Sequence, residues 1–295
     1  MLISMGKRIL LFVATNIAIV FMLTIVLQIL GISGNVRIGG RLDIGALMTF
    51  SLIWGMGGAV ISLLMSRFIA KMSMGVKVVD GSTGSPDVDW LYRTVQRLAS
   101  QAQLPMPEVG VYESPEVNAF ATGPSKSRSL VAVSTGLLRS MRQDEIEGVL
   151  AHELAHIKNG DMVTMTLIQG VINAFVIFLA RLIGSLVRGS DSRNGQGLSF
   201  IVTLVLQIVL GIFGSMIVNW FSRAREFRAD AGGAALAGRT NMISALKRLQ
   251  TTQELVDTSQ PQLATLKISG ARARLLFASH PPLAERIAAL ESLRG

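Results

Sequence analysis

Two histidines and a glutamate lie close together in the segment His152-Glu153-Leu154-Ala155-His156. If this segment is helical, its two histidines share one face, so both imidazoles can bind one metal ion. Glu153 then lies beside them, where it can act as a general base on a water molecule that the metal polarises. Zinc lowers the pKa of such a water molecule to about 7. The alternative is a pair of surface histidines on an amphipathic helix, but two of the chain's three histidines fall here.

The segment around the two histidines is predicted to be a helix of about four turns. Ser140 and Gln143 fit the spacing of a capping box, and Asn159-Gly160 fits a helix end. Between these ends, apolar residues recur at helical spacing: Ile146, Val149, Leu150, Leu154 and Ile157.

Two histidines do not complete a catalytic zinc site, which usually has a third protein ligand and one open position. The chain contains no cysteine, so the third ligand must be His, Asp or Glu. Glu226 is the best candidate, because Asp230 follows on the same face of a predicted helix. Glu226 could bind the metal while Asp230 accepts a hydrogen bond from a ligand histidine. Alternatively, His280 is the ligand, or the two carboxylates form surface ion pairs with neighbouring arginines.

His280 precedes two prolines, so it cannot lie in the middle of a helix. Three roles stay open for it. It could donate a hydrogen bond to the oxyanion on the attacked carbonyl, close the open metal position until substrate arrives, or pack as an ordinary polar residue. Arg286, on the helix predicted after the prolines, could support the transition state.

Four long apolar stretches flank these residues. They are residues 9–36, 44–66, 162–180 (extending past Arg181 to Val187) and 198–222. The first two exceed the roughly 20 residues that a helix needs to cross a bilayer, and the first is too long for a signal peptide. The last two are also predicted to span, although Gln169 and Asn173 leave a buried helix of a soluble domain as the alternative. Only 16% of residues are charged, against about a quarter in soluble proteins.

These stretches divide the chain into four predicted parts. They are an N-terminal transmembrane hairpin (1–66), a first catalytic segment (67–161), a second transmembrane or membrane-associated hairpin (162–222) and a second catalytic segment (223–295). We expect a mainly α, α+β fold with four transmembrane helices and a small β-sheet. Its strands are predicted at residues 108–112, 118–122 and 129–134.

Basic residues beside the apolar stretches favour an orientation with both termini and both catalytic segments in the cytoplasm. They are Lys7, Arg8, Arg67, Lys71, Lys77, Arg223, Arg225 and Arg228. The loop around Arg188 and Arg193 argues the other way. The net charge of +9 fits an anionic lipid surface better than nucleic acid, because only 6% of residues are aromatic. It could also simply keep the polar part soluble.

Three segments together resemble the HtpX family of bacterial membrane proteases, relatives of the CAAX prenyl endopeptidases. They are residues 152–161, 222–230 and 279–282, and the likeness extends over nearly the whole chain. The resemblance implies a zincin-like domain of the gluzincin type, with one zinc ion bound by His152, His156 and Glu226. It also implies the bacterial cytoplasmic (inner) membrane and a role in protein quality control under stress. Substrate would add as a strand along a segment of the sheet edge that comprises Asn118, Ala119, Phe120 and Ala121.

We therefore expect a zinc endopeptidase that cuts membrane or misfolded proteins at the cytoplasmic face of the bilayer. The polar residues beside the zinc motif, Lys158, Asn159 and Asp161, favour a site outside the hydrocarbon. The alternatives are a prenyl-protein CAAX-type processing peptidase of the same chemistry and a catalytically silent membrane scaffold. The physiological substrate, the cleavage specificity and the oligomeric state do not follow from the sequence.

Overall fold

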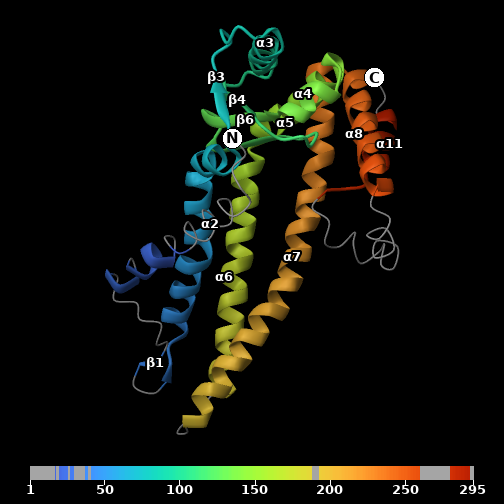
Figure 1. Ribbon diagram of the computed structural model, residues 1–295. Coiled ribbons are helices and arrows are strands. Elements are labelled where there is room, and N and C mark those ends of the chain that lie inside the picture. The colour runs from blue at the N-terminus through green and yellow to red at the C-terminus, as the bar shows by residue number, and fades with distance from the viewer. Residues whose placement is uncertain are drawn as a thin grey trace. The chain divides into compact units, whose positions relative to one another are not determined.

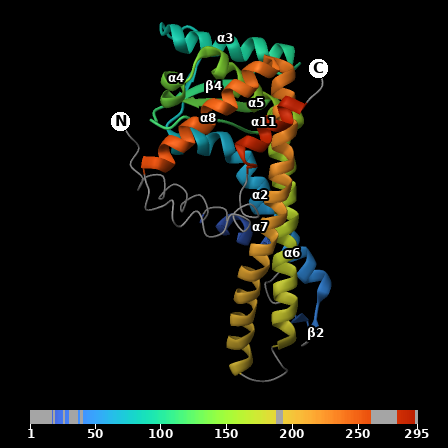
Figure 2. The ribbon, with the colours of Figure 1, turned by 90° about the vertical axis from the view of Figure 1, so that its right-hand side faces the viewer.

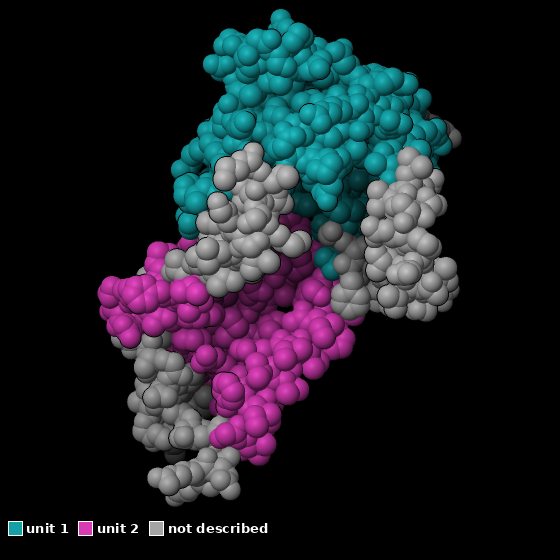
Figure 3. All heavy atoms as spheres, in the orientation of Figure 1, with its two compact units in different colours: residues 1–8, 64–163, 219–295 teal, residues 9–63, 164–218 magenta. Residues whose placement is uncertain are grey.

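The computed structural model describes residues 17, 20–25, 27–29, 37–38, 41–187, 193–259 and 280–292. Figure 1 labels its helices and strands, and most of these residues are helical. The chain forms two compact units (Figure 3). Unit 1 comprises residues 1–8, 64–163 and 219–295, and unit 2 comprises residues 9–63 and 164–218. All the residues predicted to carry chemistry belong to unit 1. The division into four functional segments stays a prediction.

Unit 1 contains a mixed sheet of four strands in the order β3-β4-β6-β5. The strands are β3 (Lys77–Val79), β4 (Glu108–Tyr112), β5 (Ala119–Ser125) and β6 (Arg128–Ser134). Strands β4 and β6 are parallel, and the other pairs are antiparallel. The three predicted strands are confirmed as β4, β5 and β6, whereas β3, which is only three residues long, was not predicted. Strand β5 pairs with β6 alone, which makes it an edge of the described sheet.

Gly123 marks the point where the regular pairing of β5 ends. Ala119 pairs with Val133, and the register shifts between Thr122 and Ser125. The backbone of Gly123 has φ +145°, and a Cβ there would lie 2.2 Å from the carbonyl oxygen of Arg128. Only glycine fits so close to a neighbouring backbone. The regular part of this edge strand is therefore its first half.

Helix α5 (Gln143–Asn159) lies at the centre of unit 1 and carries the two motif histidines. It contacts α3 (Pro86–Gln101), α8 (Arg239–Ser259) and β5, while α11 (Leu283–Ser292) contacts α8 (Figure 2). The main core, to which α3, α5, α8 and the sheet contribute, is apolar. Its fully buried residues include Leu91, Leu98, Val131, Leu150 and Leu154. Because α5 is packed on several sides, its rotation is fixed, and so is the direction of its polar side chains.

The start of α5 differs from the prediction. Ser140 ends a separate short helix, α4 (Thr135–Ser140), so a capping box of Ser140 and Gln143 is wrong. Instead, the backbone N–H of Arg142 donates to Glu145 Oε2 at 2.8 Å. The chain is extended at Arg142, and a glutamate three residues after such a position can satisfy its N–H. The capping contact therefore involves Arg142, two residues after the predicted Ser140.

Unit 2 consists mainly of long apolar helices. Three described helices are long and apolar enough to cross a membrane: α2 (Ile44–Met74), α6 (Asp161–Val187) and residues Gly197–Ala237 of α7 (Arg193–Ala237). Within unit 2, a Cβ on Gly55 of α2 would lie 2.3 Å from the backbone nitrogen of Ala174 of α6, so these helices pack closely. Most of the first predicted span, residues 9–36, lies outside the described residues. The described part of it, residues 17, 20–25 and 27–29, is helical.

Candidate metal centre

The two motif histidines lie on one buried face of α5. His152 and His156 are each 8% exposed, and their Nε2 atoms lie 3.1 Å apart. The rings meet edge to face, with centroids 4.6 Å apart. This is the arrangement expected of residues four apart on a helix that both turn toward one point. Both Nε2 atoms are therefore directed at the same small volume.

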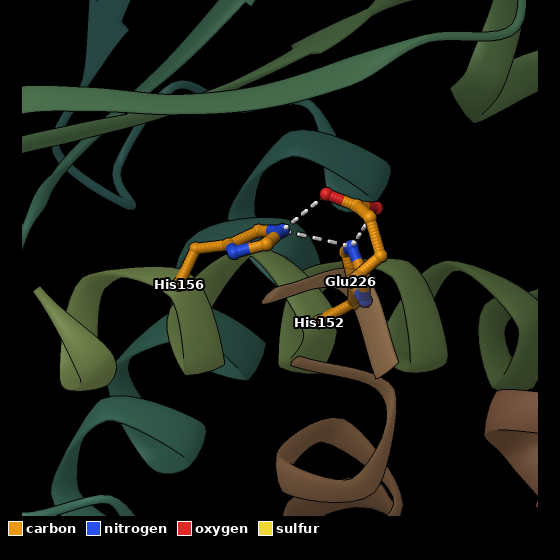
Figure 4. Close-up of side chains that lie close together, drawn as sticks. All are labelled: His152, His156 and Glu226. Atoms are coloured by element: carbon orange, nitrogen blue, oxygen red, sulfur yellow. Dashed lines mark hydrogen bonds and ion pairs between the residues drawn. The ribbon is translucent and has the colours of Figure 1, made fainter. Parts of the chain in front are cut away.

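Glu226, on α7, completes a cluster of three ligand atoms (Figure 4). Its carboxylate is 1% exposed, with Oε2 at 3.5 Å from His152 Nε2 and Oε1 at 3.4 Å from His156 Nε2. One ligand atom from each of the three side chains lies within 4.8 Å of the others. The structure thus brings together the three residues that were predicted as metal ligands.

The donor set fits a divalent metal ion. Neither carboxylate oxygen of Glu226 has a partner in hydrogen-bond geometry, although both are buried. Burying a carboxylate without hydrogen bonds costs several kcal/mol. A cation bound to this carboxylate would offset that cost. Two imidazoles and one carboxylate are also the ligands of many hydrolytic zinc sites. These residues could hold such an ion directly.

Each ligand histidine has a carboxylate on its other ring nitrogen. His152 Nδ1 lies 2.9 Å from Asp230 Oδ1, and His156 Nδ1 lies 2.6 Å from Asp161 Oδ2. A carboxylate on Nδ1 keeps the proton there and leaves Nε2 with its lone pair for a metal. The predicted position of Asp230 is therefore consistent with the structure, whereas a contact between Asp161 and a histidine was not predicted.

Arg286 holds the carboxylate side of the cluster. It is buried and donates from Nε to Asp230 Oδ2 at 2.7 Å and from Nη2 to Asp230 Oδ1 at 2.6 Å. Its Nη1 lies 3.4 Å from Glu226 Oε2. Burial alone lowers the pKa of Arg286, but Asp230 and Glu226 outweigh it and raise that pKa. Arg286 was predicted to support the transition state; in the structure it contacts both carboxylates.

His280 also reaches the cluster. Its Nδ1 lies 3.0 Å from Glu226 Oε2, without hydrogen-bond geometry, and its side chain is 61% exposed. An exposed imidazole at the rim could meet an incoming substrate, and it could equally cover the open side of the ligands. The structure therefore places His280 at the metal site.

The carboxylates change the protonation of both ligand histidines. Burial lowers the pKa of His152, but its interactions with Asp230 and Glu226 outweigh burial and raise that pKa. Burial likewise lowers the pKa of His156, and interactions with Asp161 and Glu226 raise it to about 9. The negative potential that favours a proton on these rings also favours a metal ion in its place.

A pocket of about 130 Å³ opens beside the ligands. Half-buried Glu153 lines it together with His152, Glu226, His280 and Arg286. Its apolar wall includes Leu137, Val149, Met242 and Leu246.

Of the predicted substrate-binding residues, Asn118 and Ala119 belong to the lining. Phe120 instead packs near the ring of Tyr112, and Ala121 packs against the main core.

Comparisons with known proteins show the family of the chain. Peptidase family M48 matches residues 87–294. Protease HtpX of Pseudoalteromonas atlantica is 51% identical over 288 residues, which cover 96% of this chain and 99% of that protein. The Protease HtpX homolog of Verminephrobacter eiseniae is 53% identical over 293 residues, which cover 97% and 98%.

Among solved structures, S. mikatae Ste24p matches with a TM-score of 0.62 at 20% identity, over 94% of this chain and 62% of that one. This likeness shows a shared fold. The predicted resemblance is confirmed: the chain belongs to peptidase family M48, among the HtpX proteases, and is a metallopeptidase.

Proposed function

We propose that this bacterial membrane protein is a zinc endopeptidase of the inner membrane that cuts polypeptides at the cytoplasmic face. His152, His156 and Glu226 bind the metal, and Glu153 is the general base. The observation that carries the proposal is the convergence of one ligand atom from each of the three ligand residues within 4.8 Å, beside a pocket that Glu153 also lines. A catalytic site needs such ligands with an open side for substrate.

Bound zinc would act as a Lewis acid and lower the pKa of a water molecule at the site. Glu153 follows His152 directly and lines the same pocket, so it can accept the proton from that water and pass it to the leaving amine. His280 and Arg286, both at the pocket, can donate hydrogen bonds to the oxyanion of the attacked carbonyl. Asp230 and Asp161 hold the two imidazoles through Nδ1.

Strand β5 offers a place for the substrate backbone. It is an edge of the described sheet. Its first residue, Ala119, lines the pocket with Glu153, as does Asn118 immediately before the strand. An extended polypeptide that pairs with β5 would bring one peptide bond past this base. Recognition through backbone hydrogen bonds tolerates many side chains, which suits a protease that removes damaged or misfolded proteins.

The metal and the substrate class can be tested with purified protein in mild detergent. After removal of metal with a chelator, we expect zinc to restore cleavage of casein, an unfolded protein, better than magnesium or calcium does. A farnesylated peptide is the matched substrate for the alternative. Efficient cleavage of that peptide without cleavage of casein would favour the prenyl-processing function instead.

The orientation can be tested by labelling, because the chain has no cysteine. Ser127→Cys adds a thiol between β5 and β6 of unit 1, and Ser190→Cys adds one in the segment between the third and fourth apolar stretches. In intact cells, a membrane-impermeant maleimide should label Ser190→Cys and should leave Ser127→Cys unlabelled until the membrane is opened. The reverse pattern would contradict a cytoplasmic site.

A further inference from the structure

Asp161 makes one of the shortest polar contacts at the metal centre. Its Oδ2 lies 2.6 Å from His156 Nδ1, and the residue is 2% exposed. This contact leaves His156 Nε2 directed at Glu226 Oε1, 3.4 Å away. How strongly metal binding depends on Asp161 is therefore decided by how well this contact holds the ring of His156.

The backbone between the two residues explains how Asp161 reaches the ring. Helix α5 ends at Asn159, and Gly160 caps it in the left-handed conformation, with φ 70° and ψ 29°. The N–H of Gly160 bonds to the carbonyl oxygens of His156 and Ile157. Helix α6 then begins directly at Asp161. Because the chain changes direction at Gly160, the side chain of Asp161 lies against the imidazole of His156, five residues earlier in the sequence.

The surroundings of Asp161 differ from those of Asp230. Both oxygens of Asp230 accept hydrogen bonds from buried Arg286. The nearest arginine contact of Asp161 is Arg228 Nη2, 3.7 Å from Oδ1, and the side chain of Arg228 is 66% exposed. Asp161 is thus directed mainly at His156.

We infer that Asp161 is a positioning residue that fixes the ring orientation and tautomer of His156 and thereby sets metal affinity. The inference rests on the proposed metal site. A carboxylate on Nδ1 keeps the proton on that nitrogen, aligns Nε2 and increases its basicity as a ligand. Loss of such a partner typically weakens metal binding by about 10- to 100-fold. Because Asp161 is also the first residue of α6, one ligand is held by the start of a candidate membrane helix.

The test uses the full chain in mild detergent and measures competition between the protein and a chelator for zinc. Asp161→Ala should weaken zinc binding by roughly 10- to 100-fold. Asp161→Asn should fall between alanine and wild type, because its amide oxygen still accepts the Nδ1 proton but carries no charge. Asp144→Asn is the control: it removes a carboxylate from the same region of the chain, one paired with Arg142, and should bind zinc as wild type does.

Cobalt provides a second readout that a merely structural role would not change. The visible absorption of bound Co²⁺ reports the geometry of its ligands, and we expect it to shift in both Asp161 variants and to stay unchanged in Asp144→Asn. Wild-type affinity and spectrum in Asp161→Ala would overturn the inference. If the alanine variant does not fold, the same result in Asp161→Asn would overturn it. A wild type that binds neither metal would instead contradict the proposed function itself.

Gly160 allows the backbone to be tested without touching a ligand. A Cβ at this position would meet nothing within 4 Å, so Gly160→Ala changes only the conformational preference. An alanine disfavours the left-handed conformation at φ 70°, whereas an asparagine tolerates it. We expect weaker zinc binding in Gly160→Ala than in Gly160→Asn. Equal affinities that match wild type in both would argue that this turn does not set the position of Asp161.

Discussion

The two compact units differ in which side chains they bury and which they expose. Apart from Glu145 at the start of α5, the buried acidic and basic side chains in the described part of unit 1 form one cluster: His152, His156, Asp161, Glu226, Asp230 and Arg286. In the described part of unit 2, the only buried polar residue is Ser51, and large apolar side chains are exposed instead, such as Val171, Phe175, Phe200, Ile208 and Phe213. Charges can be buried where they are paired, and apolar side chains can be exposed where lipid replaces water. This difference is expected if unit 1 carries the proposed metal site and unit 2 lies in the membrane.

The largest effect is expected when Glu226, the proposed carboxylate ligand that lies close to both histidines, is changed. Glu226→Gln keeps the size of the side chain and removes its charge, so metal affinity should fall by more than about 100-fold, beyond the effect of losing an outer partner. Casein cleavage should be lost with it. Elemental analysis after dialysis measures the metal, and recovery of the variant in the membrane fraction shows that unit 2 is intact. A variant that keeps metal and activity would exclude Glu226 as a ligand.

A second prediction compares a buried ion pair with an exposed one, both involving α11. Arg286→Met leaves Asp230 buried without its arginine partner and should lower the free energy of unfolding by about 3–5 kcal/mol. Lys247→Met breaks the ion pair between Lys247, 58% exposed, and Glu291, 53% exposed. It should lower the free energy of unfolding by no more than about 1 kcal/mol. Urea unfolding followed by tryptophan fluorescence measures both. Equal losses would show that burial is not what makes the Arg286 pair important.

A third prediction tests whether exposed apolar residues of the two units face different solvents. Ile208 on α7 is 58% exposed and Val78 on β3 is 49% exposed. Lysine at the centre of a membrane helix costs about 2.5–3.5 kcal/mol, so Ile208→Lys should reduce the fraction of protein that resists extraction by alkaline carbonate. Val78→Lys should leave that fraction unchanged, because surface substitutions cost within about 0.5 kcal/mol. The same membrane fraction for both variants would contradict a lipid-facing α7.

The smallest effect concerns pH. In the metal-free protein the pKa of His156 is raised from 6.5 to about 9. The proton on His156 therefore stabilises the metal-free fold fully below pH 6.5, and this stabilisation is lost as the pH rises through about 9. A metal must displace that proton, so its affinity should fall roughly tenfold per pH unit below this pKa. Thermal unfolding with and without zinc should show a larger metal-induced shift at pH 8.5 than at pH 7. A shift that does not vary with pH would contradict the prediction.

The features that depend on local pattern could be predicted from the sequence. The helix that carries His152 and His156 follows from apolar periodicity, and the spans follow from length and composition. Glu226 could be identified because its partner Asp230 lies one turn away on the same helix and because cysteine is absent. In each case the pattern that supports the prediction lies within one short segment of the chain.

The remaining features depend on how distant or irregular segments come together. Arg286 and Asp230 are 56 positions apart, so their paired hydrogen bonds follow only from the packing of α11 beside the site. The contact of Asp161 with His156 requires the left-handed turn at Gly160, and helical spacing cannot predict it. Strand β3 is too short to show an alternating pattern.

The central claim is that this site binds a metal and uses Glu153 as the base. The most direct test purifies wild type and Glu153→Gln in detergent with zinc present, then measures metal by elemental analysis and cleavage of casein. We predict about one metal ion per chain in both proteins, as the three-residue ligand cluster implies, and cleavage by wild type alone. Equal cleavage by both proteins, or a wild type without metal, would contradict the account.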